Sequence, residues 1–330
     1  MAVTTQPATP AATPAIPAAE APPGPGYVRM GYVFAAVGAL LFSTKAVIIK
    51  LAYGESIDAE TLLALRMAFS LPFYFGIGWL SIRDRQRSGK PLPSGREVVA
   101  AAGVGLLGYW FASYTDFLGL EYISAQFERL ILFTYPLFVV IFGAMFFRQP
   151  IRLRAVLAIG VSYAGLAVIF GEKVSTFGHD IAIGAGFVLL AAIAFAMYQL
   201  LARGLIATIG PRLFTCIAMS GAAVGAFAQF FLTHPAGDLI VSSTLYGYAL
   251  LIAIGATVLP SFFLNAALHR ISAQANATIG TLSPVMTILL AVLILGERIT
   301  LVDIAGTALV LAGVGWFTLA DQAAFRRKNG

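Results

Sequence analysis

Long apolar runs separated by short polar segments fill the chain from residue 29 almost to its end. The runs cover 30–51, 60–82, 96–118, 123–147, 151–171, 182–204, 212–233, 244–268, 273–295 and 300–320. A helix needs about 20 mostly apolar residues to cross the hydrocarbon of a bilayer. The runs are too long for the strands of a membrane barrel, which have about 10 residues. The pattern therefore predicts ten transmembrane helices, because a helix pairs its own backbone groups within lipid.

The chain also repeats itself at a constant spacing. Ile-Ser-Ala-Gln at 123–126 returns at 271–274, and Pro136 returns as Pro284, both 148 positions later. Each copy then holds five predicted helices, and an odd number places the second copy upside down relative to the first. Inverted repeats are typical of secondary transporters, whose substrate site lies near the middle of the bilayer. We predict an all-α membrane protein of two inverted five-helix repeats, at 29–171 and 172–320, with tails at 1–28 and 321–330.

Composition agrees with a membrane protein and narrows the remaining classes. Hydrophobic residues make up 59% of the chain, charged residues 11%, and the mean hydropathy is +0.87; soluble domains have about 25% charged residues. The tail at 1–28 is rich in Pro, Ala and Thr, which predicts disorder. Cys216 is the single cysteine and the three histidines are far apart, so we expect no intramolecular disulfide, no metal site and no cofactor.

The positive charges predict the orientation. Fifteen Lys and Arg residues fall in the tails and loops of one side, while the other side has Lys50, Lys173 and Arg298. Cytoplasmic loops collect Lys and Arg, so both termini are expected in the cytoplasm of a protein of the cytoplasmic (inner) membrane. The same rule explains the net charge of +6 without a nucleic-acid partner.

Several short motifs resemble one known family. They are the run Leu295-Gly296-Glu297-Arg298-Ile299-Thr300 between the last two predicted helices, Arg66 in the second, and Pro136 and Pro284 in the fourth helix of each repeat. With the repeat, they are similar to the drug/metabolite transporter superfamily, in its EamA type of two five-helix domains. The resemblance covers everything except the tails. The chain departs from the family at Arg148-Gln149-Pro150 and at residues 41–45. The resemblance implies an exporter of small metabolites, amino acids or drugs; some relatives carry nucleotide sugars.

Five ionisable residues lie inside the predicted helices: Lys45, Arg66, Asp116, Glu128 and Arg129. A charge at the bilayer centre costs about 2.5–3.5 kcal/mol on insertion scales, so such residues usually face a cavity or a partner. Their predicted positions lie in the outer half of the membrane. They line a substrate path, or they form a structural ion-pair cluster with some side chains reaching the interface. Coupling of transport to protons stays an open alternative. Burial favours the protonated form of a carboxyl group, whereas a nearby cation favours the charged form.

Helical spacing groups further polar residues with these charges. Tyr109, Ser113 and Asp116 share a face, as do Glu128 and Tyr135, while Tyr198 takes the repeat position of Lys45. The complete set of candidate substrate-binding residues is Lys45, Arg66, Tyr109, Ser113, Asp116, Glu128, Arg129, Tyr135, Tyr198, Asn265, Asn276 and Ser283. Small and hydroxyl residues also serve close helix packing, for which Gly221 and Gly225 have the required spacing.

These observations favour a secondary transporter or facilitator for a small polar metabolite, amino acid-like or amphipathic, moved outward by alternating access. The alternatives are a nucleotide-sugar carrier or channel of the same fold, or a membrane enzyme. An enzyme would need clustered acids or an activated nucleophile, and the sequence offers no such motif. The expected partners are a small-molecule substrate and the lipid bilayer, and association into a homodimer stays open.

Overall fold

The computed structural model describes residues 25–147, 153–177, 179–268, 270 and 282–329, and the elements in these ranges are helices. The first half contains α1 (Pro25–Tyr53), α2 (Ala59–Arg87), α3 (Gly95–Gly105), η1 (Leu106–Phe111), α4 (Ala112–Tyr122), α5 (Ala125–Leu132), α6 (Tyr135–Phe147) and α7 (Leu153–Phe177). The second contains α8 (Asp180–Ile209), α9 (Pro211–Thr233), η2 (Ala236–Leu239), α10 (Ser243–Leu250), η3 (Leu251–Val258), α11 (Leu259–Leu268), α13 (Leu282–Leu295) and α14 (Leu301–Asn329).

Seven helical stretches of the described ranges are long and apolar enough to cross a membrane. They are Arg29–Tyr53, Ala59–Arg87, Gly95–Tyr122, Ala125–Phe147, Asp180–Ile209, Pro211–Thr233 and Ser243–Phe263. Each coincides with one of the predicted runs, which makes this a multi-pass integral membrane protein. The runs at 151–171, 273–295 and 300–320 overlap α7, α13 and α14, of which α13 is described only from Leu282.

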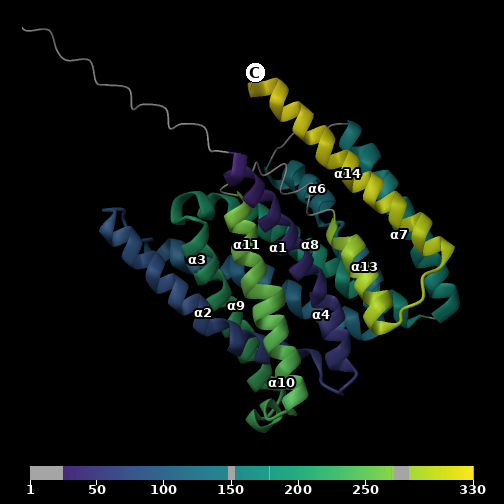
Figure 1. Cartoon of the computed structure of the whole chain (residues 1–330), viewed down its shortest axis with the longest axis horizontal. Helices are drawn as coiled ribbons and strands as arrows, with labels where there is room; N and C mark the ends of the chain where they lie inside the picture. Colours follow the sequence, from purple (N-terminus) through teal and green to yellow (C-terminus); the bar gives the residue numbers. More distant parts are fainter. Residues whose placement is uncertain (1–24, 148–152, 178, 269, 271–281, 330) are drawn as a thin grey trace, which may run out of the picture.

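Helix α1 lies in the middle of the bundle and contacts elements of both halves. It packs against α4 and α5 of the first half and against α11 and α13 of the second. Helices α7 and α14 pair along one edge of the molecule, while α2, α3 and α9 form the opposite edge (Figure 1). A polar residue of α1 that faces the interior of the bundle can therefore contact side chains from both halves of the sequence.

One π-helical turn interrupts the third helix of each predicted repeat. The turn η1 joins α3 to α4, and η3 joins α10 to α11. Shifting residues 106–111 by the repeat spacing of 148 gives 254–259, which overlaps η3. A duplicated unit is expected to place such turns at equivalent positions, and π-helical turns are frequent at functional sites. The inverted ten-helix arrangement itself stays a prediction.

Local sequence explains where helices start and break. Asp58 precedes α2 and its carboxylate accepts a hydrogen bond from the Thr61 backbone N–H at 2.7 Å, a typical N-cap. Burial acts to raise the pKa of Asp58, but the hydrogen bonds from Thr61 and the nearby His234 together outweigh it, so the pKa lies below its usual value. The break between α5 and α6 falls just before Pro136, whose ring nitrogen has no hydrogen to donate.

The predicted packing role of Gly221 agrees with the contact between α9 and α3. A Cβ atom at Gly221 would lie 2.6 Å from the backbone oxygen of Ala102, so the two helices approach too closely for a side chain there. Small residues allow such an approach between transmembrane helices.

Helices extend into both predicted tails, and two of the predicted loop charges lie in helices. Residues 1–24 lie outside the described ranges, and α1 already begins at Pro25, within the predicted tail. Helix α14 continues to Asn329, because 321–329 contain neither Gly nor Pro. Lys50 and Lys173, assigned to loops, lie in α1 and α7, where Lys50 donates to the Leu120 carbonyl at 2.8 Å. A lysine side chain has a long apolar stem, so a lysine can lie within a helix near the membrane surface while its ammonium group reaches a polar environment.

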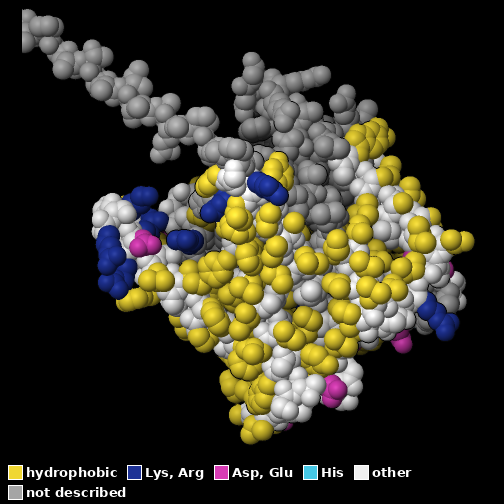
Figure 2. Space-filling view, viewed as in Figure 1, with side chains coloured by type: hydrophobic (Ala, Val, Ile, Leu, Met, Phe, Trp, Pro, Cys, Tyr) yellow, Lys and Arg dark blue, Asp and Glu magenta, His cyan; other side chains and the backbone are white. Residues whose placement is uncertain are grey.

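The surface has the amphipathic distribution expected of a protein in a bilayer. Figure 2 shows hydrophobic side chains over most of the visible face, with a group of Lys and Arg near the C-terminal end of α2 and the start of α1. Many large apolar side chains are exposed there and elsewhere, among them Phe75, Trp79 and Leu289. Lipid would cover this belt.

Candidate substrate-binding site

The buried charges meet between α1, α4 and α5. Lys45 from α1 forms an ion pair with Asp116 from α4, with 2.6 Å between Nζ and Oδ2. Glu128 and Arg129 follow one another on α5, and the Glu128 Oε2 lies 3.8 Å from the Arg129 Nε. All four side chains are at least nine-tenths buried. We call Lys45, Asp116, Glu128 and Arg129 the charged cluster.

An aromatic ring from α1 lies next to both cations of the charged cluster. Phe42 has its ring centroid 5.7 Å from the Lys45 Nζ and 5.3 Å from the Arg129 guanidinium carbon. Arg129 Nη2 also donates to the Phe42 backbone oxygen at 3.4 Å. A cation near an aromatic face is stabilised by the ring's negative surface, more strongly where water is excluded.

A carboxylate from the second half fixes the start of α5. Glu297 accepts hydrogen bonds from the backbone N–H groups of Ala125 at 2.8 Å and Gln126 at 3.3 Å. Ser124 caps the same helix, accepting from Phe127 N–H, and a negative charge at a helix N-terminus is favourable. Glu297 belongs to the Gly-Glu motif, so this motif holds in place the helix that carries Glu128 and Arg129.

Arg66 lies beside the charged cluster on α2. Its Nη2 donates to Ser113 Oγ at 3.1 Å and to the Tyr109 backbone oxygen at 3.4 Å, and its guanidinium carbon lies 5.2 Å from the Phe117 ring centroid. Only 3% of Arg66 is exposed. The turn η1 contributes Tyr109 and α4 contributes Ser113, so the predicted polar face of the third helix is turned toward Arg66.

Tyrosines and phenylalanines continue the site toward α8. The hydroxyl groups of Tyr109 and Tyr198 are 2.9 Å apart, and the Tyr198 ring stacks on Phe195 with centroids 5.6 Å apart. Tyr135 meets Phe195 edge to face at 4.9 Å. Gly108 permits this arrangement, because a Cβ atom there would lie 2.3 Å from the Tyr198 ring.

The unsatisfied polar atoms of the described residues gather in the same region. Five of them belong to Glu128 (Oε1 and Oε2), Asp116 (Oδ1), Arg66 (Nε) and Arg129 (Nε), and the sixth is the Tyr74 hydroxyl. Buried polar atoms in native proteins nearly always have a partner, so a concentration of exceptions indicates a functional role or bound molecules.

The remaining candidates divide into one that joins the site and two that the structure does not test. Ser283 on α13 lies 3.0 Å from Ser43 Oγ on α1, one residue from Phe42. Asn265 lies on α11, but its side chain is outside the described part of the structure, and Asn276 lies in the undescribed range 271–281.

A second buried ion pair was not predicted from the sequence. Lys173 on α7 pairs with Asp303 on α14 at 2.8 Å, and Thr300 donates its backbone N–H to the same Asp303 oxygen at 3.0 Å. Asp303 lies within the predicted run 300–320, so the set of five intramembrane charges was incomplete. The signal was present as Thr-Leu-Val-Asp, which has the spacing of a capping box. Its position on the α7–α14 edge makes this pair a natural comparison for the charged cluster.

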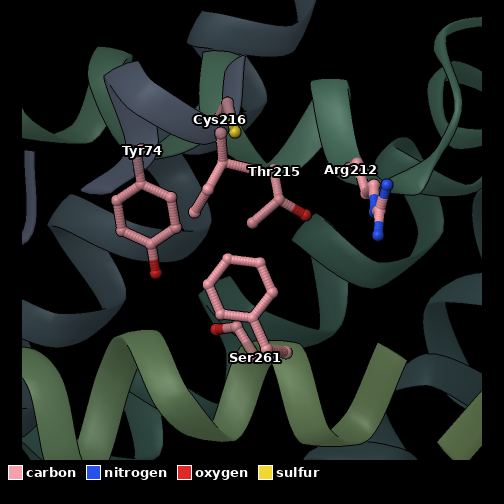
Figure 3. Close-up of a pocket in the computed structure, with 7 residues that line it drawn as sticks. Tyr74, Arg212, Thr215, Cys216 and Ser261 are labelled. Atoms are coloured by element: carbon pink, nitrogen blue, oxygen red, sulfur yellow. The ribbon is translucent and has the colours of Figure 1, made fainter. Parts of the chain in front are cut away.

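A small cavity lies between α2, α9 and α11. Its volume is about 10 Å³, enough for about one water molecule. Tyr74, Cys216, Ser261 and Arg212 are among its lining residues (Figure 3). Within the described ranges, no group of three His, Cys, Asp or Glu side chains is placed to hold a metal ion.

Long apolar helices that enclose charged and polar side chains define an integral membrane protein with a polar path or site within the bilayer. Residues 29–171 and 182–319 match the EamA-like transporter family. The chain belongs to this family, within the drug/metabolite transporter superfamily, and is a membrane transporter.

Known relatives agree with this assignment. A Bacillus subtilis (strain 168) protein named as the uncharacterized transporter YcbK is 30% identical over 84% of this chain and 88% of its own length. An uncharacterized transporter of Synechocystis sp., sll1319, is 23% identical over 91% of this chain and 96% of its own. A solved crystal structure with 18% identity matches 90% of this chain and 99% of its own with a TM-score of 0.60, which shows a shared fold.

Proposed function

We propose that this transporter moves a small polar solute across the cytoplasmic membrane by alternating access, with both termini in the cytoplasm and net transport outward. The observation that carries the proposal is the charged cluster with Arg66 beside it. Five intramembrane charges from four helices lie together, and several of their polar atoms are buried without a hydrogen bond. A purely structural cluster would satisfy those atoms, because leaving them unpaired within a membrane is costly.

The contacts around the cluster suggest how the site opens. Lys45–Asp116 joins α1 to α4, and Glu297 joins the end of α13 to α5. The α5–α6 break before Pro136 provides a point at which α5 can move relative to α6. In our proposal, the solute competes for the cluster's charges and loosens these contacts on one side of the membrane at a time. The two inverted halves would then rock about the site.

The site fits an amino acid-like or amphipathic solute better than a nucleotide sugar. A nucleotide sugar needs several free cations for its diphosphate, whereas Lys45 and Arg129 already have carboxylate neighbours. The tyrosines and Phe195 offer apolar surface for the rest of an amphipathic solute. A channel of the same fold remains the second candidate, and counterflow distinguishes it from a carrier.

Proton coupling through Glu128 belongs to this proposal as well. Both of its carboxylate oxygens are buried without a hydrogen-bond donor, and the Asp116 side chain lies near them. Two neighbouring buried carboxylates favour binding of a proton by one of them. A pH gradient should then drive uptake in wild-type proteoliposomes and fail to do so with Glu128→Gln.

Substrate-panel counterflow in proteoliposomes tests the transport proposal. We expect an unlabelled solute to drive uptake of its labelled form in the wild type, and Lys45→Ala and Glu128→Gln to lose this activity while remaining folded. Lys173→Ala is the matched control, because it removes the buried lysine of the ion pair on the α7–α14 edge. If the two cluster variants transport as well as the wild type does, the cluster is structural. Absence of counterflow with every solute would argue against a carrier.

Thiol labelling of intact cells tests the orientation. In a Cys216→Ala background, a membrane-impermeant reagent should label Asp238→Cys, which lies in the exposed η2 segment, and leave the exposed Lys90→Cys unlabelled until the cells are opened. The reverse pattern would place the termini outside.

A further inference from the structure

Arg66 is the one cation of the site without a direct ion pair among the described residues, although Asp116 lies near enough to interact with it electrostatically. Lys45 pairs with Asp116, and Arg129 lies beside Glu128. Among the described residues no carboxylate forms an ion pair with Arg66, whose hydrogen-bond acceptors are the neutral Ser113 hydroxyl and Tyr109 carbonyl. An arginine stays charged in proteins, and a buried charge without a counter-ion is expensive.

The Arg66 guanidinium also has an N–H group that makes no hydrogen bond. Its Nε–H is buried and has no acceptor, while Nη2 makes both of the hydrogen bonds described above. A carboxylate binds a guanidinium best through two neighbouring N–H groups, which gives a short and directional pair of hydrogen bonds. The free Nε therefore marks the edge of Arg66 that a bound anion would approach.

The surroundings of Arg66 complete a place for a small organic anion. The Tyr74 hydroxyl, eight residues further along α2, is buried close to the Ser261 hydroxyl and lies near enough to Arg66 to interact with it electrostatically. Tyr74 lines the small cavity, and Arg212 lies at the same cavity (Figure 3). An anion that arrives through an enlarged form of this cavity would meet a cation, then a hydroxyl donor, then the unpaired guanidinium.

We propose that Arg66 binds the carboxylate group of the transported solute through its free Nε edge, with the Tyr74 hydroxyl as an additional donor. The proposal rests on the proposed transport function and narrows its substrate class to solutes with a carboxylate. The pairing neutralises the excess positive charge of the site while the solute crosses the membrane. It also explains why the protein keeps a buried arginine that forms no direct ion pair with any described carboxylate.

Binding of matched carboxylates and amides tests the idea without requiring transport. Purified protein in detergent is titrated with phenylacetate, hexanoate and phenylalanine, and with the corresponding neutral or cationic amides, while thermal stability is followed. We expect saturable stabilisation by at least one carboxylate, with its amide binding at least about tenfold more weakly, as for the loss of one charge-assisted hydrogen bond. Equal binding of acid and amide, or no stabilisation by any carboxylate, would overturn the proposal.

Variants assign the binding to Arg66. Arg66→Gln should weaken the carboxylate at least about tenfold and leave the amide unchanged, and Tyr74→Phe, which keeps the ring, should weaken it by a smaller factor. Arg83→Gln is the matched control, since Arg83 is on the same helix and stacks on Trp79 away from the site. If Arg66→Gln does not fold, Tyr74→Phe and the wild-type comparison of acids with amides still test the proposal.

Transport data separate this inference from the broader function. Counterflow of neutral or cationic solutes, together with no preference for carboxylates, would refute the role of Arg66 and leave the carrier function intact. Carboxylate binding that depends on Arg66, without counterflow of the same carboxylate, would support the binding site and refute the carrier function.

Discussion

Removing the carboxylate of Glu297 provides a sharp test of how the second half of the chain supports the site in the first. This carboxylate accepts the N–H groups of Ala125 and Gln126, the first two residues of α5. The same helix carries Glu128 and Arg129, so Glu297→Ala should both destabilise the protein and misplace the charged cluster.

The structure allows the size of the effect to be estimated. Loss of a capping acceptor costs about 0.5–2 kcal/mol, and loss of a negative charge at a helix N-terminus adds about 0.3–1 kcal/mol. Ser124 remains as a cap and accepts from Phe127, so we expect about 1–2 kcal/mol for Glu297→Ala. Glu297→Gln keeps one acceptor oxygen and should lose about half as much.

A second capping glutamate provides the matched control. Glu97 accepts hydrogen bonds from the backbone N–H and the hydroxyl of Ser94, both at 2.8 Å, at the exposed start of α3. Unfolding in mixed detergent micelles gives the stability of Glu297→Ala and Glu97→Ala, and counterflow gives their activity. We expect both variants to lose stability and only Glu297→Ala to lose transport. Equal transport by the two variants, at matched stability, would refute the link between the Gly-Glu motif and the site.

Three further predictions concern stability. Asp116→Asn removes the carboxylate that pairs with Lys45 and should cost about 3–5 kcal/mol. The double variant Lys45→Met/Asp116→Leu should cost much less than Lys45→Met and Asp116→Leu together, as unfolding of these three variants would show. Gly108→Ala should cost about 1–3 kcal/mol through overpacking against Tyr198, and an unchanged melting temperature would contradict the close approach. The lowered pKa of Asp58 means that its stabilising effect is present above about pH 4 and is lost as the pH falls through the folded-state pKa, so the stability gap between wild type and Asp58→Ala should close in acid.

The helices could be predicted from sequence because the bilayer imposes their length. The ten apolar runs all overlap helices. The extent of α14 was harder to predict, since 321–329 are polar yet contain good helix formers. Polarity indicates where a helix leaves the membrane and does not by itself indicate where the helix ends.

The site was predictable in part, because intramembrane charges are rare enough to be noticed individually. Their pairing was not predictable: Lys45 and Asp116 are 71 residues apart, and only the packing of α1 on α4 brings them together. Phe42 and Tyr74 were not among the predicted candidates, because isolated aromatic residues in a membrane helix have no distinctive pattern. Lys173 was missed because it lies near a predicted helix end, where a lysine usually reaches water.

The π-helical turn η1 has a consequence for the register of the third helix. A π-helical turn holds one residue more than an α-helical turn, and one residue corresponds to about 100° of rotation about an α-helix. Deleting a single residue from Leu106–Phe111 would restore a regular α-helix, yet it would rotate the side chains on the two sides of the turn relative to each other by about that angle. Ser113 could then face Arg66 only if α3 turned away from α9. The extra residue therefore sets the rotation between the two parts of the third helix. With that rotation, α3 packs against α9 while Ser113 faces Arg66.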